Sequence, residues 1–215
     1  MITAMADQLK GKVCLITGAT SGIGTFTAAG LAAQGAEVVL AGRNRQKAED
    51  ALDLIQRRTG SEALSYLLAD FRDLGQVRSL ALDFKARYPR LDVLVNNAGA
   101  FFFSRRESSY GIEMTLLVNH VAPFLLTNLL LDLLQASAPA RIVNVSSDGH
   151  KMANMDLTDL GCSHGYQGMK AYARSKLATL RSPMSWPGVW RAAASPSTLS
   201  TRGMSQPTCG ARTSR

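Results

Sequence analysis

Apolar positions along the chain cluster in short β-rich runs, separated by longer stretches in which they recur every three or four residues. The runs cover residues 12–17, 36–41, 63–69, 91–99 and 140–147. The first is a continuous apolar run, which is typical of a strand that is buried on both faces of a parallel sheet. We therefore predict five parallel strands.

The stretches between the runs have the apolar spacing of amphipathic helices. Gly35 and Gly60 close the first two of these stretches, as glycine often does at the end of a helix. Strands that alternate with helices in this way predict an α/β fold, a Rossmann-like doubly wound parallel sheet with helices on both faces. The predicted helices cover residues 22–35, 45–60, 74–88 and 110–134.

The pattern changes near the end of the chain. A polar loop over residues 148–168 leads into a helix that Tyr172 begins, and a fold of this class continues into a sixth strand. The sequence predicts no such strand, because residues 179–215 lack periodicity and are rich in Pro, Ser, Thr and Arg. We predict an incomplete domain over residues 1–178, truncated after that helix, and a disordered basic tail over residues 179–215.

The charge of the chain changes this picture little. The 215 residues are 46% hydrophobic, enough for one domain with a substantial core, and the net charge is +8. Five of the positive charges belong to arginines of residues 179–215, which contain no carboxylate, so residues 1–178 carry only +3. This small surplus, spread over mixed-sign helical faces, argues against nucleic acid as a partner.

Cysteine usage and hydropathy indicate the compartment. Cys14, Cys162 and Cys209 lie far apart and lack the spacing of a metal site or a disulfide framework. The first residues lack the apolar core of a signal peptide, and the longest apolar stretch is too short to span a bilayer. We therefore expect no metal site, no transmembrane segment and a cytoplasmic protein.

The sequence TGATSGIG joins the first predicted strand to the first predicted helix. Gly18 permits a tight turn, Gly22 lets the backbone approach a phosphate, and Gly24 allows the helix to pack closely on the strand. The N-terminus of the helix then meets a pyrophosphate, with Ser21 and Ile23 in the same binding loop. This context favours a dinucleotide site over the alternative, a glycine-rich turn without a ligand.

The end of the second predicted strand bears on the choice of dinucleotide. NAD-selective sites of this kind offer a carboxylate about 20 residues past the glycines, which binds the ribose hydroxyls. Here the sequence is LAGRN, with Arg43 and no acid. A guanidinium suits a 2′-phosphate, so we predict NADP(H) in preference to NAD(H). The alternative is that Arg43 is a solvated loop charge.

Five motifs occur in an order that resembles the short-chain dehydrogenase/reductase family. They are TGxxxGIG at 17–24, NNAG at 96–99, an asparagine at 119, NVSS at 144–147 and YxxxK at 172–176. The resemblance covers about residues 8–178. The wording NVSSDGH, the long gap between Ser147 and Tyr172, and the sequence AYARSKLA are most similar to the retinol-dehydrogenase-like branch of that family.

The resemblance implies four catalytic residues. Tyr172 is the general acid/base, and Lys176, on the same helical face, stabilises its phenolate; both also contact the cofactor. Ser147 hydrogen-bonds the substrate oxygen, with Ser146 as the alternative, because neighbouring strand residues face opposite sides. Asn119 holds a water in a proton relay with Lys176, or is a polar helix residue without a special role.

The resemblance also implies contacts along the rest of the cofactor. Asp70, after the third predicted strand, bonds the adenine. Asn97, Ala98 and Gly99, in the NNAG motif, line the cofactor.

These features together predict an NADP(H)-dependent oxidoreductase that moves hydride between the nicotinamide and a small apolar carbonyl or alcohol substrate. A homo-oligomer becomes possible if the missing C-terminal part is restored. The alternative is a catalytically inactive dinucleotide-binding fragment, because the family's substrate-binding part follows the catalytic helix.

The tail has two interpretations. Read in a shifted frame, codons from Met184 onward can encode a continued helix, a strand and a Pro-Gly turn, which the family has after its catalytic helix. We interpret residues 179–215 as family sequence translated out of frame. A true disordered tail is the alternative.

Overall fold

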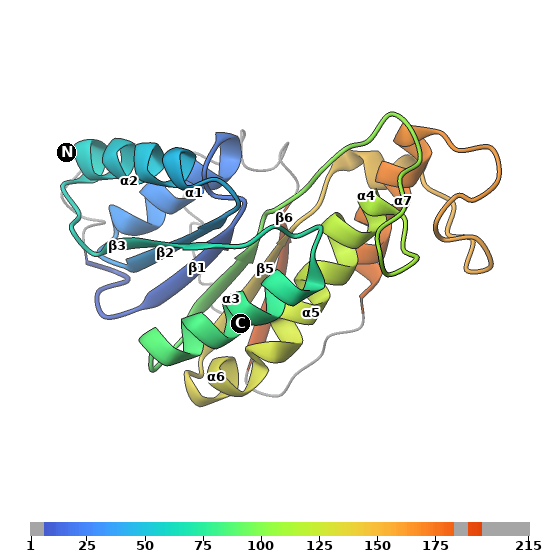
Figure 1. Ribbon diagram of the computed structural model, residues 1–215. Coiled ribbons are helices and arrows are strands. Elements are labelled where there is room, and N and C mark those ends of the chain that lie inside the picture. Colours follow the sequence, from blue (N-terminus) through green and yellow to red (C-terminus); the bar gives the residue numbers. More distant parts are fainter. Residues whose placement is uncertain (1–6, 183–188, 195–215) are drawn as a thin grey trace, which may run out of the picture.

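The computed structural model describes residues 7–182 and the backbone of residues 189–194 (Figure 1). Within these residues the strands form a six-stranded sheet with the order β3-β2-β1-β4-β5-β6, and every neighbouring pair is parallel. This confirms the doubly wound Rossmann-like sheet that the sequence predicts. The strands are β1 (Val13–Thr17), β2 (Glu37–Gly42), β3 (Leu64–Leu68), β4 (Val93–Asn96), β5 (Ala140–Val145) and β6 (Val189–Ala194).

Helices cover both faces of the sheet (Figure 1). Helices α1 (Gly22–Ala32) and α2 (Arg45–Thr59) pack on one face, and α3 (Leu74–Arg87) and α5 (Ala122–Leu129) pack on the other. Strand β1 shows why the run is apolar throughout. Cys14 and Ile16 belong to the core cluster on one face, Val13 and Leu15 belong to the cluster on the other, and all four are buried.

The structure divides the helix that the sequence predicts over residues 110–134. It consists of α4 (Met114–Leu116), the π-helical segment η1 (Leu117–Val121), α5 and α6 (Leu131–Ala136). The helical stretch begins at Met114 because Glu113 caps α4, and its carboxylate accepts hydrogen bonds from the N–H groups of Thr115 and Leu116 at 3.0 and 2.8 Å. The prediction of a single uninterrupted helix is therefore wrong.

Proline explains part of the irregularity. Pro123 has no N–H to donate to the carbonyl of Asn119, four residues earlier. The hydroxyl of Thr179 in α7 (Gly168–Arg181) donates to that carbonyl instead, at 3.1 Å. The irregular turn thus joins the middle of the long helix to the helix that carries Tyr172.

The strand β6 corrects the sequence-based expectation for the tail. No strand is predicted after the Tyr172 helix, but the backbone of residues 189–194 pairs with β5, with Ala140 opposite Val189 and Val145 opposite Ala194. Three of the six residues are alanine, which is depleted in strands, so the composition of this segment does not indicate one, and pairing with the open edge of β5 forms it. The predicted disorder is also wrong for residues 179–181, because α7 runs to Arg181 and the buried Thr179 donates to the carbonyls of Asn119 and Ser175. The rest of the disorder prediction and of the out-of-frame interpretation concerns residues 183–188 and 195–215, which lie outside the described residues.

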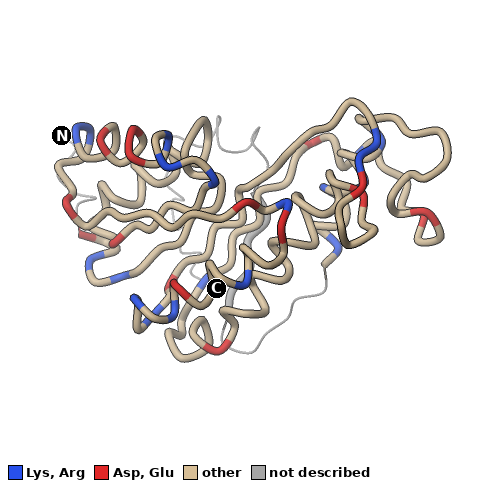
Figure 2. The backbone as a smooth tube through the Cα atoms, in the orientation of Figure 1, with Lys and Arg blue, Asp and Glu red and all other residues tan. Residues whose placement is uncertain are grey.

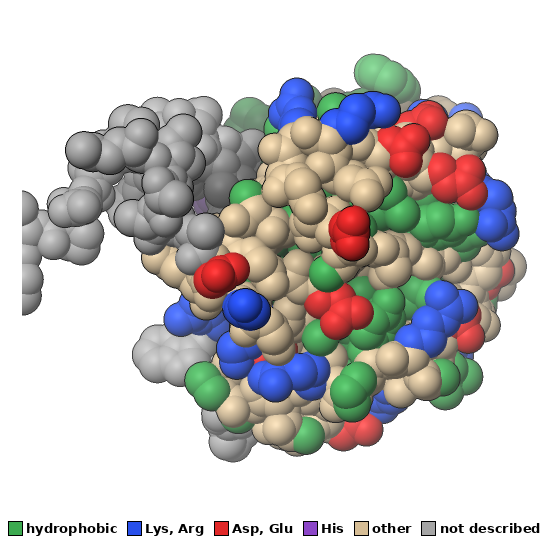
Figure 3. Space-filling model, turned by 90° about the vertical axis from the view of Figure 1, so that its left-hand side faces the viewer, with side chains coloured by type: hydrophobic (Ala, Val, Ile, Leu, Met, Phe, Trp, Pro, Cys, Tyr) green, Lys and Arg blue, Asp and Glu red, His purple; other side chains and the backbone are tan. Residues whose placement is uncertain are grey.

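Charged residues are distributed over the whole fold. Lys and Arg, like Asp and Glu, are spread over many separate segments of the backbone (Figure 2). The face drawn in Figure 3 likewise mixes basic, acidic and apolar side chains. No helix in the described part of the chain is both long enough and apolar enough to cross a membrane.

Candidate active site

The turn between β1 and α1 is built on glycine. Gly18 and Gly22 adopt φ angles of 63° and 57°, in the left-handed region that favours glycine. A methyl group added at Gly24 would lie 2.5 Å from the carbonyl oxygen of Gly18, so α1 can pack this closely only without a side chain there. Nothing lies within 4 Å of a methyl group added at Gly22. The turn is therefore closed against the strand and open on its outer side.

The N–H groups in the first turn of α1 receive no hydrogen bond acceptor from the side chain of the capping residue. Ser21 is the N-cap and has an extended backbone, but its side chain makes no capping hydrogen bond. The first turn contains no acidic residue. An anion fits this position, because free N–H groups and the positive end of the helix dipole meet there.

The end of β4 is tied to the same turn. The Thr17 hydroxyl accepts hydrogen bonds from the N–H groups of Asn97 and Ala98, both at 3.0 Å. The Asn97 side-chain amide donates to the carbonyls of Thr17 and Gly18 at 2.9 and 3.0 Å. These bonds end β4 at Asn96, before the predicted end at residue 99, and turn the NNAG segment into the loop beside the glycines.

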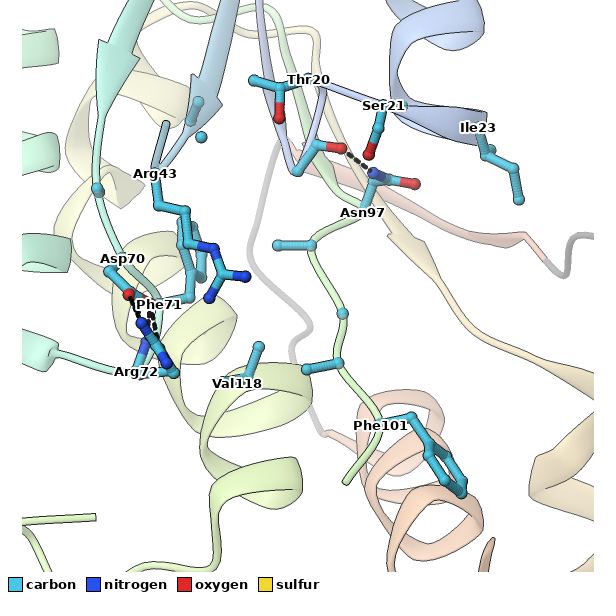
Figure 4. A pocket seen from close by; sticks show the side chains of 18 of the residues that line it. Thr20, Ser21, Ile23, Arg43, Asp70, Phe71, Arg72, Asn97, Phe101 and Val118 are labelled. Carbon is cyan, nitrogen blue, oxygen red and sulfur yellow. Dashed lines mark hydrogen bonds and ion pairs between the residues drawn. The ribbon is translucent and has the colours of Figure 1, made fainter. Parts of the chain in front are cut away.

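A cavity of about 730 Å³ opens along this turn, at the carboxyl ends of the strands (Figure 4). It lies where the strand order reverses between β1 and β4, the usual ligand position in open α/β sheets. The charged residues that line it are Arg43, Asp70, Arg72 and Arg106. The predicted cofactor residues that line it are Gly18, Ser21, Ile23, Gly24, Arg43, Asp70, Asn97, Ala98 and Gly99.

Asp70 is already paired within this cavity. Arg72 donates through its side-chain Nε to both carboxylate oxygens, at 3.0 and 2.9 Å. Its backbone N–H also donates to Oδ1, at 3.0 Å. Partial burial opposes the charged carboxylate, but the hydrogen bonds and the charge of Arg72 outweigh it and lower the pKa of Asp70. Asp70 is therefore a stable anion that faces a cation.

A second cavity of about 310 Å³ continues from the first and is lined by Tyr172 and Lys176. The two cavities share five lining residues: Ile23, Asn97, Gly99, Ala100 and Phe101. Together they form one groove that runs from Arg43 past the glycine turn to Tyr172.

Tyr172 and Lys176 lie on one face of α7, as their spacing predicts. The ammonium nitrogen of Lys176 lies 5.8 Å from the centre of the Tyr172 ring and donates to the carbonyl of Val145 at 3.0 Å. The side chain of Lys176 is buried. Burial disfavours the charged form and lowers the pKa of Lys176 to about 8.

Asn119 lies beside this pair, but its side chain binds protein atoms. Its Oδ1 accepts from the N–H of Ala100 at 2.7 Å, and its Nδ2 donates to the Ala100 carbonyl and to the Ser175 hydroxyl at 3.0 and 2.9 Å. A methyl group added at Gly99 would lie 3.5 Å from both Asn119 Oδ1 and Lys176 Nζ. Asn119 thus holds the loop after β4 against α7, and its role in a water relay stays a prediction.

The two serines after β5 lie differently. Ser146 is buried and donates to the carbonyl of Lys176 at 3.2 Å. Ser147 is the N-cap of the short helix η2 (Asp148–Met152) and accepts from the N–H of Gly149 at 3.2 Å. A methyl group added at Gly149 would contact both the Ser147 hydroxyl at 3.5 Å and the Tyr172 ring at 3.6 Å. This shared neighbour favours Ser147, although Ser146 lines the second cavity.

Two further features position this site. The run AFFFSRR at residues 100–106 predicts a loop that borders the nicotinamide pocket, with a partner-facing apolar patch as the alternative. Phe101 lines the second cavity, with its ring centre 5.7 Å from that of Tyr172, and the ring centre of Phe103 lies 5.0 Å from that of Phe101. Arg174, between Tyr172 and Lys176, is buried and donates to the carbonyls of Asn154 and Asp159, and nothing in the sequence marks it as buried.

The fold and the groove define a dinucleotide-binding α/β protein with a tyrosine–lysine pair at one end of its ligand site. The chain belongs to the short-chain dehydrogenase family, whose model matches residues 12–181. Its relatives at about 40% identity place it in the retinol-dehydrogenase-like branch.

Two curated relatives and one solved structure illustrate the likeness. Dehydrogenase/reductase SDR family member 13 of Bos taurus is 41% identical over 177 residues, which cover 80% of this chain and 46% of the relative. Retinol dehydrogenase 11 of Mus musculus is 43% identical over 173 residues, covering 80% and 55%. The Pseudomonas aeruginosa RhlG/NADP active-site complex has a TM-score of 0.64 and 30% identity, and the match covers 81% of this chain and 65% of that one. The chain thus spans about half the length of the curated relatives it matches.

Proposed function

We propose that the chain binds NADP(H) and transfers hydride between its nicotinamide and a small apolar carbonyl or alcohol. The observation that carries the proposal is the continuous groove, which joins Arg43 and the glycine turn to Tyr172 and Lys176. The groove fits a dinucleotide, because Gly18 and Gly24 leave no room for side chains where the strand and helix converge, whereas the side at Gly22 is open. The similar protein RhlG forms a complex with NADP, which supports the same choice of cofactor.

Different residues of the groove bind different parts of the cofactor. The N-terminal turn of α1 receives the pyrophosphate, and Arg43 receives the 2′-phosphate. The loop of Asn97 to Gly99 lies along the middle of the groove, and Ile23 lines both cavities. When bound, NADP(H) supplies or accepts the hydride at its nicotinamide ring.

Tyr172 moves the proton. In the reducing direction its hydroxyl donates a proton to the substrate oxygen, and in the oxidising direction its phenolate takes one back. Lys176 stabilises the phenolate by its positive charge. Ser147 donates a hydrogen bond to the substrate oxygen and so stabilises the negative charge that develops there.

The substrate is apolar. Phe101 lines the second cavity next to Tyr172, and the exposed Phe103 packs edge-on against Phe101. An aromatic side chain at this position favours an apolar body attached to the reacting carbonyl or alcohol. The name of the relative retinol dehydrogenase 11 supports an apolar alcohol or its aldehyde. The cytoplasmic location and any homo-oligomer stay predictions.

The test is NADPH oxidation by the full chain against a panel of apolar aldehydes and ketones. We expect turnover with at least one apolar aldehyde or ketone, and lower turnover when NADH replaces NADPH. Saturable NADPH binding without turnover on any compound would instead support the inactive dinucleotide-binding fragment. Failure to bind either cofactor would refute the proposed function outright.

A further inference from the structure

Two arginines lie at the end of the groove farthest from Tyr172. Arg43 directly follows β2, and Arg72 lies in the segment that follows β3. Both line the larger cavity, and their guanidinium groups lie on the same side of it (Figure 4). Strands β2 and β3 are neighbours in the parallel sheet, with Gly42 opposite Leu68, and this brings the two segments together.

Asp70 fixes the position of Arg72 but does not use all of its guanidinium. The carboxylate takes the edge formed by Nε and Nη2, in the bidentate geometry that suits an arginine. Nη1 makes no hydrogen bond to the described part of the chain. The Arg72 side chain is 46% exposed and that of Asp70 is 19% exposed. A bound anion can therefore reach the remaining edge.

The balance of charge in this part of the groove is positive. Three arginines and one carboxylate line the cavity, and the carboxylate is paired with Arg72. Arg43 also contributes to lowering the pKa of Asp70, so its charge is within electrostatic reach of the pair. Arg43, Arg72 and Asp70 together carry a net charge of +1, and a phosphate there would meet two guanidinium groups, one of which also faces Asp70.

We propose that Arg72, oriented by Asp70, is a second guanidinium for the 2′-phosphate of NADP(H), beside Arg43. Asp70 is then a positioning residue for Arg72 and does not act chiefly as an acceptor for the adenine. This inference rests on the proposed function and names a specificity determinant within that site.

The first experiment measures the dissociation constants of NADPH and NADH for the full chain and for Arg72→Gln, by nicotinamide fluorescence. Loss of one charge-assisted contact predicts about tenfold weaker NADPH binding, with NADH binding unchanged within about twofold. Arg78→Gln is the matched control, because it removes the same charge from α3 at an exposed position outside the cavity. An equal loss of affinity for NADPH and NADH in Arg72→Gln, or an unchanged affinity for NADPH, would overturn the inference.

The second experiment tests the role of Asp70 by combining Asp70→Asn with Arg72→Gln. If Asp70 acts through Arg72, Asp70→Asn changes the NADPH-to-NADH ratio in the parent but not in the Arg72→Gln background. If Asp70 instead binds the adenine, Asp70→Asn weakens the binding of NADPH and NADH equally in both backgrounds, and the inference fails. The retained affinity for NADH reports that each variant is folded.

The two experiments also distinguish this inference from the proposed function. A parent that binds neither NADPH nor NADH refutes the proposed function. The other case is a parent that prefers NADPH, with the preference lost in Arg43→Gln and unchanged in Arg72→Gln. That result leaves the proposed function intact and refutes only the role of Arg72.

Discussion

At the scale of single residues, the site depends on a lysine that is buried with its charge. Lys176 donates to the carbonyl of Val145, and no carboxylate in the described residues lies within ion-pair distance of it. Desolvation therefore lowers its pKa from 10.5 to about 8. A buried ammonium of this kind lowers the free energy of unfolding. It can also stabilise a phenolate on Tyr172, because the ammonium has no other charged partner among the described residues.

The first prediction at this scale concerns Tyr172. Tyr172→Phe should abolish turnover on any carbonyl that the parent reduces, because it removes the proton that is transferred. The affinity for NADPH should stay within about threefold, since little cofactor contact is lost. Steady-state kinetics together with NADPH titration check both statements. A variant that retains a substantial fraction of parental kcat would show that Tyr172 is not the proton donor.

The second prediction concerns the free energy of unfolding and its dependence on pH. Between about pH 8 and 10.5 the unfolded chain keeps the Lys176 proton and the folded chain does not, so the contribution of Lys176 to the free energy of unfolding rises with pH in this window. Below the window the folded protein contains the buried ammonium. Lys176→Met should therefore raise the free energy of unfolding near pH 7 by on the order of 1–3 kcal/mol, less the lost hydrogen bond.

Urea denaturation near pH 7 and near pH 9.5 measures this effect. The gain in Lys176→Met should shrink at the higher pH, and Lys170→Met, at an exposed position of the same helix, should show no such change. Equal differences between variant and parent at the two pH values would contradict the assignment of the lowered pKa.

The sequence predicts the reacting residue types well and their supports poorly. Tyr172, Lys176 and the glycines occur at spacings that a helix and a tight turn impose, so local geometry suffices to place them. The partners of Asn119 and Arg174 include main-chain groups of Ala100, Asn154 and Asp159, which are brought close only by the tertiary fold. No period or motif in a single sequence reports such contacts.

At the scale of elements, α7 organises the groove through contacts on several sides. Thr179 reaches the carbonyl of Asn119 in η1, and Ser175 accepts from the Asn119 side chain. On another side Arg174 holds the loop after η2, by donating to two carbonyls and to the sulfur of Cys162 at 3.3 Å. The helix thereby fixes the positions of Tyr172 and Lys176 against both the loop after β4 and the loop after η2.

The prediction at this scale concerns Arg174. Arg174→Gln should lower the free energy of unfolding by on the order of 2–4 kcal/mol, because it removes a buried cation and leaves its acceptors unsatisfied. Amide hydrogen exchange should increase in the loop of residues 153–165. Lys170→Gln, exposed on the same helix, is the control and should leave both quantities unchanged. Parental exchange rates in that loop of Arg174→Gln would contradict the structural role of the arginine.

The elements themselves divide into those the sequence predicts and those it does not. The apolar runs predict β1 to β5 and the helices α1 to α3 because burial on both faces and helical spacing are local signals. The π-turn at η1 depends on Pro123 and on the hydroxyl of a distant Thr179, and β6 depends on the open edge of β5. Pro123 inside the predicted helix is a local signal for a break, whereas the contact with Thr179 and the pairing of β6 arise only in the tertiary fold.

At the scale of the whole molecule, the parallel sheet brings separate segments to one groove. The carboxyl ends of β1, β2 and β4 provide the glycine turn, Arg43 and the loop of Asn97, and α7 closes the far end with Tyr172. All of these elements lie between residues 13 and 181, within the part of the chain that the family model matches. We therefore expect this chain to carry the protein groups needed for hydride and proton transfer.

The most direct test is the transfer of deuterium from NADPH that carries deuterium at both positions of the reactive C4 carbon of the nicotinamide to an apolar aldehyde or ketone, followed by mass spectrometry of the alcohol. We predict deuterium on the former carbonyl carbon with the full chain and none with Tyr172→Phe. An alcohol formed without deuterium, or no alcohol from a chain that binds NADPH tightly, would contradict hydride transfer at this site.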